Sequence, residues 1–193
     1  GQFLLSETKD RSTLLSELTR LNPVEVLIYE NALFSPEIQD RKGICKKPAW
    51  HFDSHTGREL LLRHFRCLDL VGYGCEHLTV ALGAAGAMLQ YIKETQHVIP
   101  PHIQGIRLLN YDDAVSIDAA SRRNLEINWH PSGNLTFTLQ GILDQTVTAM
   151  GGRCLHRWLN RPLRDHDILN ARYEALDALI SESHYEQVRD LLS

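Results

Sequence analysis

Two hydrophobic periods alternate through the first part of the chain. Apolar residues recur at helical spacing over residues 11–21, and strand-like apolar runs lie on either side, at 2–6 and 24–29. A strand, helix, strand order is typical of α/β domains, so we predict an α/β fold. Asp10 is placed to cap the helix, and Pro23 is expected to end it because the residue before a proline is pushed out of the α region.

The next segment is predicted to continue this mixed pattern. The predicted elements are a short helix with Ser35 as its cap and Pro36 at its first position, a basic loop at 41–48, a strand at 50–53, and helices over 57–65 and 76–96. Thr56 and Glu59 have the spacing of a capping box, which favours a helix start beside them. The small residues between Ala81 and Ala87 would let the last helix pack closely against a neighbour.

Helices dominate the remainder of the chain. The predicted elements are a stiff connector at 98–101, two extended pieces between 102 and 117, a helix over 119–126 capped by Asp118, a polar loop at 128–134, helices over 135–147, 150–160 and 167–180, and a last helix opened by Ser183 and Glu186. This change of pattern predicts two domains, an α/β domain over residues 1–104 and an all-helical domain over residues 105–193.

Composition narrows the class of protein. The 193 residues are 43% hydrophobic and carry a formal charge of -4, which allows one or two packed cores and argues against a broad surface for duplex DNA. The four cysteines lack a CxxC pair, so we expect reduced thiols rather than disulfides or a zinc site. No apolar stretch reaches membrane-spanning length, and we expect a cytoplasmic location. Because the chain begins at Gly1 without Met, we expect it to be a piece of a larger protein.

Two patterns in the sequence suggest a possible functional site, and each of them also has a purely structural explanation. Gly72 and Gly74 are spaced like the start of a dinucleotide-binding loop, but His77 stands where a third glycine is needed. Glu30 and Asp53 end predicted strands and could converge as a two-metal nuclease centre of the RNase H type, although strand-end and capping acids have the same pattern. We therefore predict no catalytic, cofactor-binding or metal-binding residue, and we keep the metal-dependent nuclease as the alternative function.

Histidines form another set of candidates. His51 with His55, and His64 with Cys67, have helical spacing that could place two metal ligands on one face. Spacing alone does not define a metal site, because a tetrahedral centre needs further ligands. We expect these histidines to be hydrogen-bonded or to face solvent.

The sequence DQTVTAMGGRCLHRWLNRPLRD, at residues 144–165, is the most distinctive segment. Leu155, Trp158 and Leu159 share one face of its predicted helix. Trp158 and Leu159 are expected to anchor it in a core, while its arginines point to solvent or bridge to neighbouring helices. This cationic strip and the basic segment 41–47 could contact phosphate, but solvated faces explain both.

Several strings resemble landmarks of one protein family, in the order in which that family has them. They are the segment 144–165, Leu-Val-Gly-Tyr-Gly at 70–74, Ala-Ala-Gly at 84–86 followed by Leu-Gln-Tyr at 89–91, and Asp-Ala-Ala-Ser-Arg-Arg-Asn-Leu-Glu-Ile at 118–127. The chain thus resembles the bacterial DNA mismatch-repair family MutS over essentially its whole length. Ala149 is a departure, since relatives often carry proline there, and it loosens the entry to the helix.

The resemblance implies a fold and a larger protein. Residues 1–104 would be the connector domain, similar to RNase H in fold and lacking its first two strands, which leaves an open sheet edge. Residues 105–193 would begin the helical core or lever domain. The full-length protein would be a mismatch-binding ATPase and a homodimer or higher oligomer, with ATP, magnesium and mismatched duplex DNA held by domains outside these residues.

The resemblance also implies a mechanical role for this chain. It is expected to be non-catalytic, to couple DNA engagement to the state of the ATPase and to offer a surface on which MutL docks. The candidate contacts for MutL lie on the exposed face of the predicted helix over 57–65 and are Arg58, Glu59 and Arg63.

Overall fold

The structure is a computed structural model that describes residues 2–97, 101–181 and 184–192. The chain divides into two compact units, Gly1–Leu109 and Asn110–Ser193. Residues 98–100 of the predicted stiff connector and the predicted helix cap at Ser183 lie outside the described residues.

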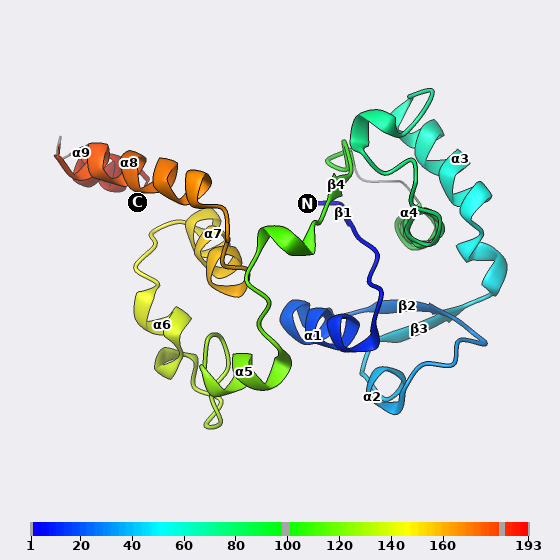
Figure 1. The fold of residues 1–193 in the computed structure, drawn as a ribbon, viewed down its shortest axis with the longest axis horizontal. Helices are drawn as coiled ribbons and strands as arrows, with labels where there is room; N and C mark the ends of the chain where they lie inside the picture. Colours follow the sequence, from blue (N-terminus) through cyan, green and yellow to red (C-terminus); the bar gives the residue numbers. More distant parts are fainter. Residues whose placement is uncertain (1, 98–100, 182–183, 193) are drawn as a thin grey trace. The chain divides into compact units, whose positions relative to one another are not determined.

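The first unit combines short strands with helices (Figure 1). Its elements are β1 (Leu4–Leu5), α1 (Arg11–Leu21), β2 (Val26–Tyr29), α2 (Pro36–Gln39), β3 (Ile44–Lys47), the 3-10 helix η1 (Ala49–Phe52), α3 (Ser54–Phe65), the 3-10 helix η2 (Val71–Tyr73), α4 (Val80–Gln96) and β4 (Arg107–Leu108). β2 pairs in parallel with β3, and β1 in parallel with β4. Parallel pairing across helical connections agrees with the predicted α/β class.

Helix α1 begins and ends at the predicted residues. The carboxylate of Asp10 accepts the amide hydrogen of Thr13 at 2.8 Å and so caps the first turn. At the other end Asn22 has a φ of 40°, and its amide donates to the carbonyl of Leu18 at 3.0 Å. The helix therefore ends in a left-handed residue rather than in the extended one that the following proline predicts.

The cap at Asp10 predicts a pH dependence. Hydrogen bonds from the Ser12 hydroxyl and the Thr13 amide lower the pKa of Asp10 from 3.8 to about 2. Because the folded pKa is below the unfolded value, this carboxylate stabilises the fold above pH 3.8 and loses that contribution as the pH falls toward about 2. An NMR titration of the Asp10 side chain should have its midpoint well below 3.8.

A matched variant isolates this effect from the other acids. Asp10→Asn keeps an oxygen that can cap the helix but has no proton to gain. Its stability should fall less than that of the unaltered chain over the same acid range. Equal acid sensitivity of the two chains would contradict the assigned role of Asp10.

Two predictions between residues 41 and 53 are wrong. The predicted basic loop contains β3, because Ile44 is half-buried and the ammonium group of Lys47 lies 2.8 Å from the carboxylate of Glu94 on α4. A paired lysine is compatible with a strand that packs against a helix. The predicted strand at 50–53 is the 3-10 helix η1, which bonds to its own backbone instead of to a neighbouring strand.

The start of α3 also differs from the prediction. The helix begins at Ser54, one turn before the predicted capping box, and its cap is Asp53. The carboxylate of Asp53 accepts the amide hydrogen of Thr56 at 2.8 Å. Thr56 therefore lies inside the first turn and does not act as the cap.

Helix α4 begins at Val80 rather than at residue 76. The carboxylate of Glu76 accepts the amide hydrogen of Leu70 at 2.7 Å, which holds the preceding segment in a loop. At the start of α4 the amide of Ala81 donates to the carboxylate of Glu7 at 2.9 Å. The helix is thus capped by a residue that lies far from it in the sequence, which local spacing cannot predict.

Helices α3 and α4 pack with their backbones in direct contact. A Cβ atom on Gly86 would lie 2.3 Å from the Cα of Gly57. The predicted close packing of the small-residue stretch is therefore confirmed. Leu61 and Leu89 lie in the core of the unit and are 0% and 1% exposed.

The second unit is helical in its described elements. They are the 3-10 helix η3 (Tyr111–Asp113), α5 (Ala119–Asn124), the 3-10 helix η4 (Leu135–Phe137), α6 (Leu139–Leu143), α7 (Ala149–Asn160), α8 (His166–Ser181) and α9 (His184–Leu192). Asp118 caps α5 as predicted, accepting the amide hydrogen of Ser121 at 2.8 Å. Across the described ranges of both units, no helix is long and apolar enough to cross a membrane.

Two expectations for the second unit are corrected. The predicted helix over 135–147 is broken at Thr138, whose hydroxyl accepts the amide hydrogen of Gly141 at 3.0 Å and so caps the separate helix α6. Trp158 is not a core anchor, since it is 43% exposed and its ring is covered by the guanidinium of Arg172 at 4.2 Å. The ring is therefore partly shielded by a cation.

A buried polar network joins α5 to the end of α7. Asn160 is 2% exposed, and its side-chain oxygen accepts hydrogen bonds from Arg122 at 2.8 Å and from Asn128 at 3.1 Å. A second guanidinium nitrogen of Arg122 donates to the backbone carbonyl of Asn160 at 3.0 Å. The end of α7 is therefore held by a charged side chain from α5.

Candidate functional site

The predicted docking residues lie on α3 and differ in their surroundings. Arg58 is half-buried, and its guanidinium lies 2.7 Å from the carboxylate of Glu76. The hydrogen bond from the Leu70 amide, and after it the bond from Arg58, hold the pKa of Glu76 below its ordinary value. Arg58 thus ties the loop before α4 to α3 and does not present a free charge.

Glu59 and Arg63 form the exposed part of this face. They are four residues apart, so they lie on successive turns of one side of the helix. Within the described part of the chain, neither side chain takes part in a hydrogen bond or an ion pair. The segment that follows α3 adds two exposed aliphatic side chains, Leu68 at 97% and Val71, the first residue of η2, at 65%. We call these four residues the α3 docking face.

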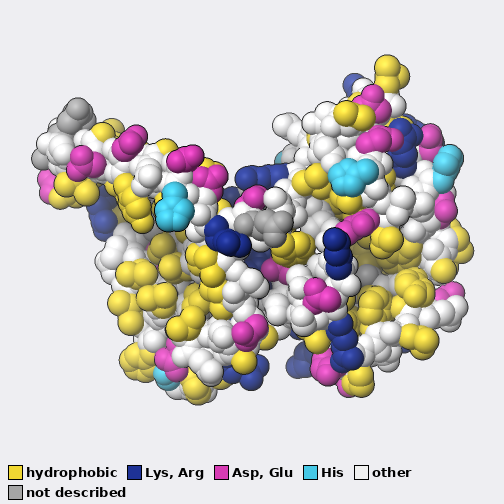
Figure 2. Space-filling view, viewed as in Figure 1, with side chains coloured by type: hydrophobic (Ala, Val, Ile, Leu, Met, Phe, Trp, Pro, Cys, Tyr) yellow, Lys and Arg dark blue, Asp and Glu magenta, His cyan; other side chains and the backbone are white. Residues whose placement is uncertain are grey.

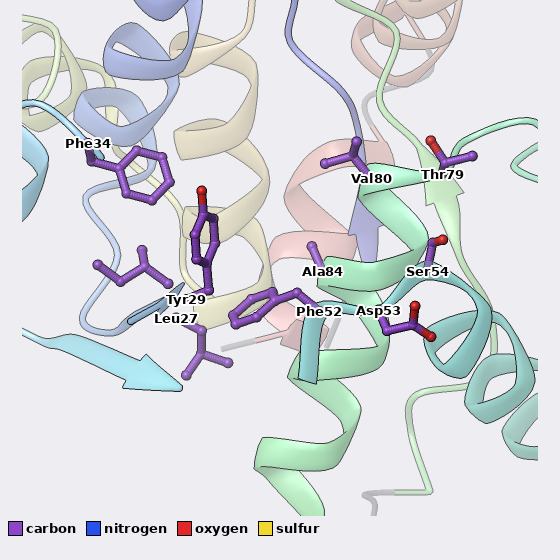
Figure 3. Close-up of a pocket in the computed structure, with 10 residues that line it drawn as sticks. Leu27, Tyr29, Phe34, Phe52, Asp53, Ser54, Thr79, Val80 and Ala84 are labelled. Atoms are coloured by element: carbon purple, nitrogen blue, oxygen red, sulfur yellow. The ribbon is translucent and has the colours of Figure 1, made fainter. Parts of the chain in front are cut away.

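A groove of about 530 Å³ opens beside β2 (Figure 3). Its lining comes mainly from apolar side chains of β2, η1 and the start of α4. The ring of Tyr29 lies between those of Phe34 and Phe52, at centroid distances of 6.4 Å and 6.2 Å. Sequence reasoning missed this groove because its walls come from segments that lie far apart in the chain.

The alternative nuclease function is not supported. Asp53 supplies the one carboxylate among the lining residues of the groove, but it caps α3, and the hydrogen bond from the Thr56 amide lowers its pKa. Glu30 is exposed directly after β2. Among the described residues, no group of three or more His, Cys, Asp or Glu side chains could hold a metal ion, whereas a two-metal centre needs several converging acids.

The candidate histidine ligands have separate surroundings. Nε2 of His64 lies 2.8 Å from the carbonyl oxygen of Ile103, and His55 is exposed, as expected for both. His51 differs from the expectation, since it is 7% exposed and its ring lies against that of Trp50, tilted by 40° at a centroid distance of 3.9 Å. Its burial follows from the 3-10 conformation of η1, which packs against α4.

The glycine pair at 72 and 74 forms a turn. Gly74 ends η2 with a φ of 70°, a left-handed conformation that glycine adopts without strain. Leu70 and Cys75, on either side of the turn, are 0% exposed. These two buried side chains therefore hold the turn in place.

Basic residues are dispersed rather than gathered into one surface. Figure 2 shows Lys and Arg side chains interspersed with Asp and Glu side chains on the face in view. In the segment 41–47, Lys47 is paired with Glu94. In the segment 144–165, Arg161 donates to the carbonyl of Asn110, whereas Arg153 is exposed.

Two domain families match the chain. The family described as MutS domain II matches residues 1–104, and the family described as MutS domain III matches residues 120–193. The chain belongs to the MutS family. It therefore carries two consecutive domains of a DNA mismatch-repair protein. The α3 docking face and the groove lie in MutS domain II, and the Arg122–Asn160 network lies in MutS domain III.

Proposed function

We propose that this chain is the non-catalytic coupling module of a mismatch-binding ATPase. The observation that carries the proposal is the match to MutS domains II and III in that order along the chain. Residues 1–104 would act as the connector and residues 105–193 as the start of the core or lever. ATP, magnesium and mismatched duplex DNA would bind to domains outside these 193 residues, in a cytoplasmic homodimer or higher oligomer.

An RNase H-like fold is part of this proposal for the connector. The amides of Val26 and Glu30, at the two ends of β2, donate to β3. Since alternate residues of a parallel strand bond to the same neighbour, the backbone of Leu27 faces the opposite edge. That edge borders the apolar groove, and we place a further strand of an RNase H-like sheet there.

The partner proposed for the α3 docking face is MutL. Exposed aliphatic side chains with charged neighbours are typical of transient protein interfaces. Leu68 and Val71 would be the apolar contacts, while Glu59 and Arg63 would set the orientation of the partner. Arg58 would act indirectly, by holding the loop through Glu76.

Charge reversal on α3 tests this role. Arg63→Glu should weaken binding of the chain to MutL by about ten-fold at low salt, because one attraction is replaced by a repulsion at the interface. Lys93→Glu, an equal change at an exposed position on α4, is the matched control and should bind like the unaltered chain. The measurement is a titration of MutL against immobilised chain at two salt concentrations. Equal affinities for both variants would exclude this face as the docking site.

A further inference from the structure

The segment that leads out of the first unit lies as a strap on the core of that unit. We call residues 103–109 the exit strap. Ile106 is 8% exposed and belongs to the same core cluster as Leu5 and Leu70, while Ile103 and Leu108 pack against that cluster. These contacts all lie within the first unit, and the second unit begins directly after the strap, at Asn110.

Backbone hydrogen bonds between β4 and β1 hold the strap in place. The amide of Arg107 donates to the carbonyl of Phe3 at 3.0 Å, and the amide of Leu109 donates to the carbonyl of Leu5 at 2.8 Å. Each of the two strands is only two residues long, and the pair is separate from the sheet of β2 and β3 (Figure 1). Isolated two-stranded pairs are marginally stable, so this pairing is weak by itself.

Two further contacts hold the strap against α3 and η2. Nε2 of His64 lies within hydrogen-bond distance of the Ile103 carbonyl, at 2.8 Å. Gly105 lies over the ring of Tyr73, where a Cβ atom would be 3.2 Å from a ring carbon. The attachment therefore consists of one buried side chain, two partly buried ones and a few hydrogen bonds.

We propose that the exit strap is a releasable latch that opens before the rest of the first unit unfolds. Local opening starts where buried apolar contacts are few, and the strap has far fewer of them than α4. A released strap of seven residues would add up to about 20 Å of extended chain between the two units. This function of the latch rests on the proposed coupling role. Whether the strap is closed or released would determine how freely one domain can reorient relative to the other.

Hydrogen exchange on the unaltered 193-residue chain tests the latch directly. We expect the amides of Arg107 and Leu109 to exchange at least about ten-fold faster than those of Ala85 and Leu89 in α4. The difference should persist at low denaturant concentration, because opening of the strap exposes little surface. Equal exchange rates with the same denaturant dependence would show that the strap opens only with the whole unit, and would overturn the proposal.

Substitutions extend this test. Ile106→Ala removes the one strap side chain of the buried core cluster and should speed exchange at Arg107 and Leu109 by about ten-fold or more. Ile92→Ala makes the same chemical change at a half-buried position on α4 and serves as the matched control. Unchanged exchange in Ile106→Ala would contradict a latch held by this side chain.

A disulfide can lock the strap. Leu4 and Arg107 are opposite each other in the β1–β4 register and both are exposed, so the double variant Leu4→Cys, Arg107→Cys has suitable spacing for a disulfide. Oxidation should slow exchange at Leu109 by about ten-fold relative to the same protein after reduction. Hydrogen exchange measures opening of the strap, whereas the MutL titration measures docking on α3. A negative result in one experiment therefore leaves the other proposal standing.

Discussion

Gly86→Ala is expected to destabilise the first unit by about 3 kcal/mol, since it introduces a methyl group where two helix backbones touch. The new Cβ atom would lie 2.3 Å from the Cα of Gly57. No rotamer change can relieve this clash, because the opposing atom belongs to the backbone. Alanine favours a helix over glycine by about 1 kcal/mol, which offsets only part of the cost.

The effect should extend beyond the substituted residue. To accept the methyl group α3 and α4 must move apart, which opens gaps around Leu61 and Leu89 in the core. Gly57→Ala should have a similar effect, since its Cβ atom would lie 2.4 Å from the carbonyl oxygen of Leu82. Both substitutions should lower the urea midpoint of the first unit.

A position in the same unit provides the control. A Cβ atom on Gly72 would meet no atom within 4 Å, so Gly72→Ala should change stability by less than about 0.5 kcal/mol. Trp50 is the one tryptophan of the first unit, and its fluorescence reports that unit alone when the other two tryptophans are replaced by phenylalanine. Equal midpoints for Gly86→Ala and Gly72→Ala would contradict the close contact between α3 and α4.

Asn160→Ala is expected to destabilise the second unit by about 3 kcal/mol, because it removes the acceptor of a buried guanidinium. The lost oxygen accepts bonds from Arg122 at 2.8 Å and from Asn128 at 3.1 Å. The lost amide also donates to the carbonyl of His156 at 2.9 Å. Leaving a buried donor without its acceptor lowers the free energy of unfolding by more than a surface hydrogen bond contributes. The loss is largest when the donor is charged.

Two variants test the physical cause. Asn160→Asp keeps the oxygen that accepts from Arg122 and Asn128 and loses the contacts of the amide nitrogen with His156, so its destabilisation should be smaller than that of Asn160→Ala. Asn170→Ala, at an exposed position on α8, should change stability by less than about 0.5 kcal/mol. In a Trp50→Phe background, Trp129 and Trp158 report urea unfolding of the second unit. Similar losses for Asn160→Ala and Asn170→Ala would show that the network adds little stability.

Separate reporters are needed because the chain has two units. A chain of two units need not unfold in a single transition. A midpoint measured on the whole chain would therefore combine the unfolding of both units. The tryptophans divide between the units, and each transition can therefore be assigned.

Predictions from local sequence succeeded where the partner of each group lies within one helical turn. The bounds of α1 and the caps at Asp10 and Asp118 are examples, because each cap oxygen bonds to an amide three residues ahead. The capping-box spacing at Thr56 was misleading for a related reason. Asp53 offers an equally local cap one turn earlier, and it had been assigned to a strand.

The errors lie where the deciding partner is remote in the sequence. β3 was predicted as part of a basic loop, yet it forms a strand in which Lys47 pairs with Glu94 on α4. Arg58 was placed on the exposed face of its helix, yet it is half-buried and paired with Glu76. The apolar groove has no local pattern at all, because β2, η1 and α4 contribute its walls.

By itself, the sequence determined the main helices, the caps of α1 and α5, the small-residue face of α4 and the resemblance to MutS, which the domain matches confirm. Only the tertiary structure decided which charges are paired, which strands meet, and that Glu7 caps α4. The reason is physical. A helix forms hydrogen bonds between residues four apart, so residues that are close in the sequence determine it. The ion pairs and parallel strands described above form only after the core has brought distant segments together.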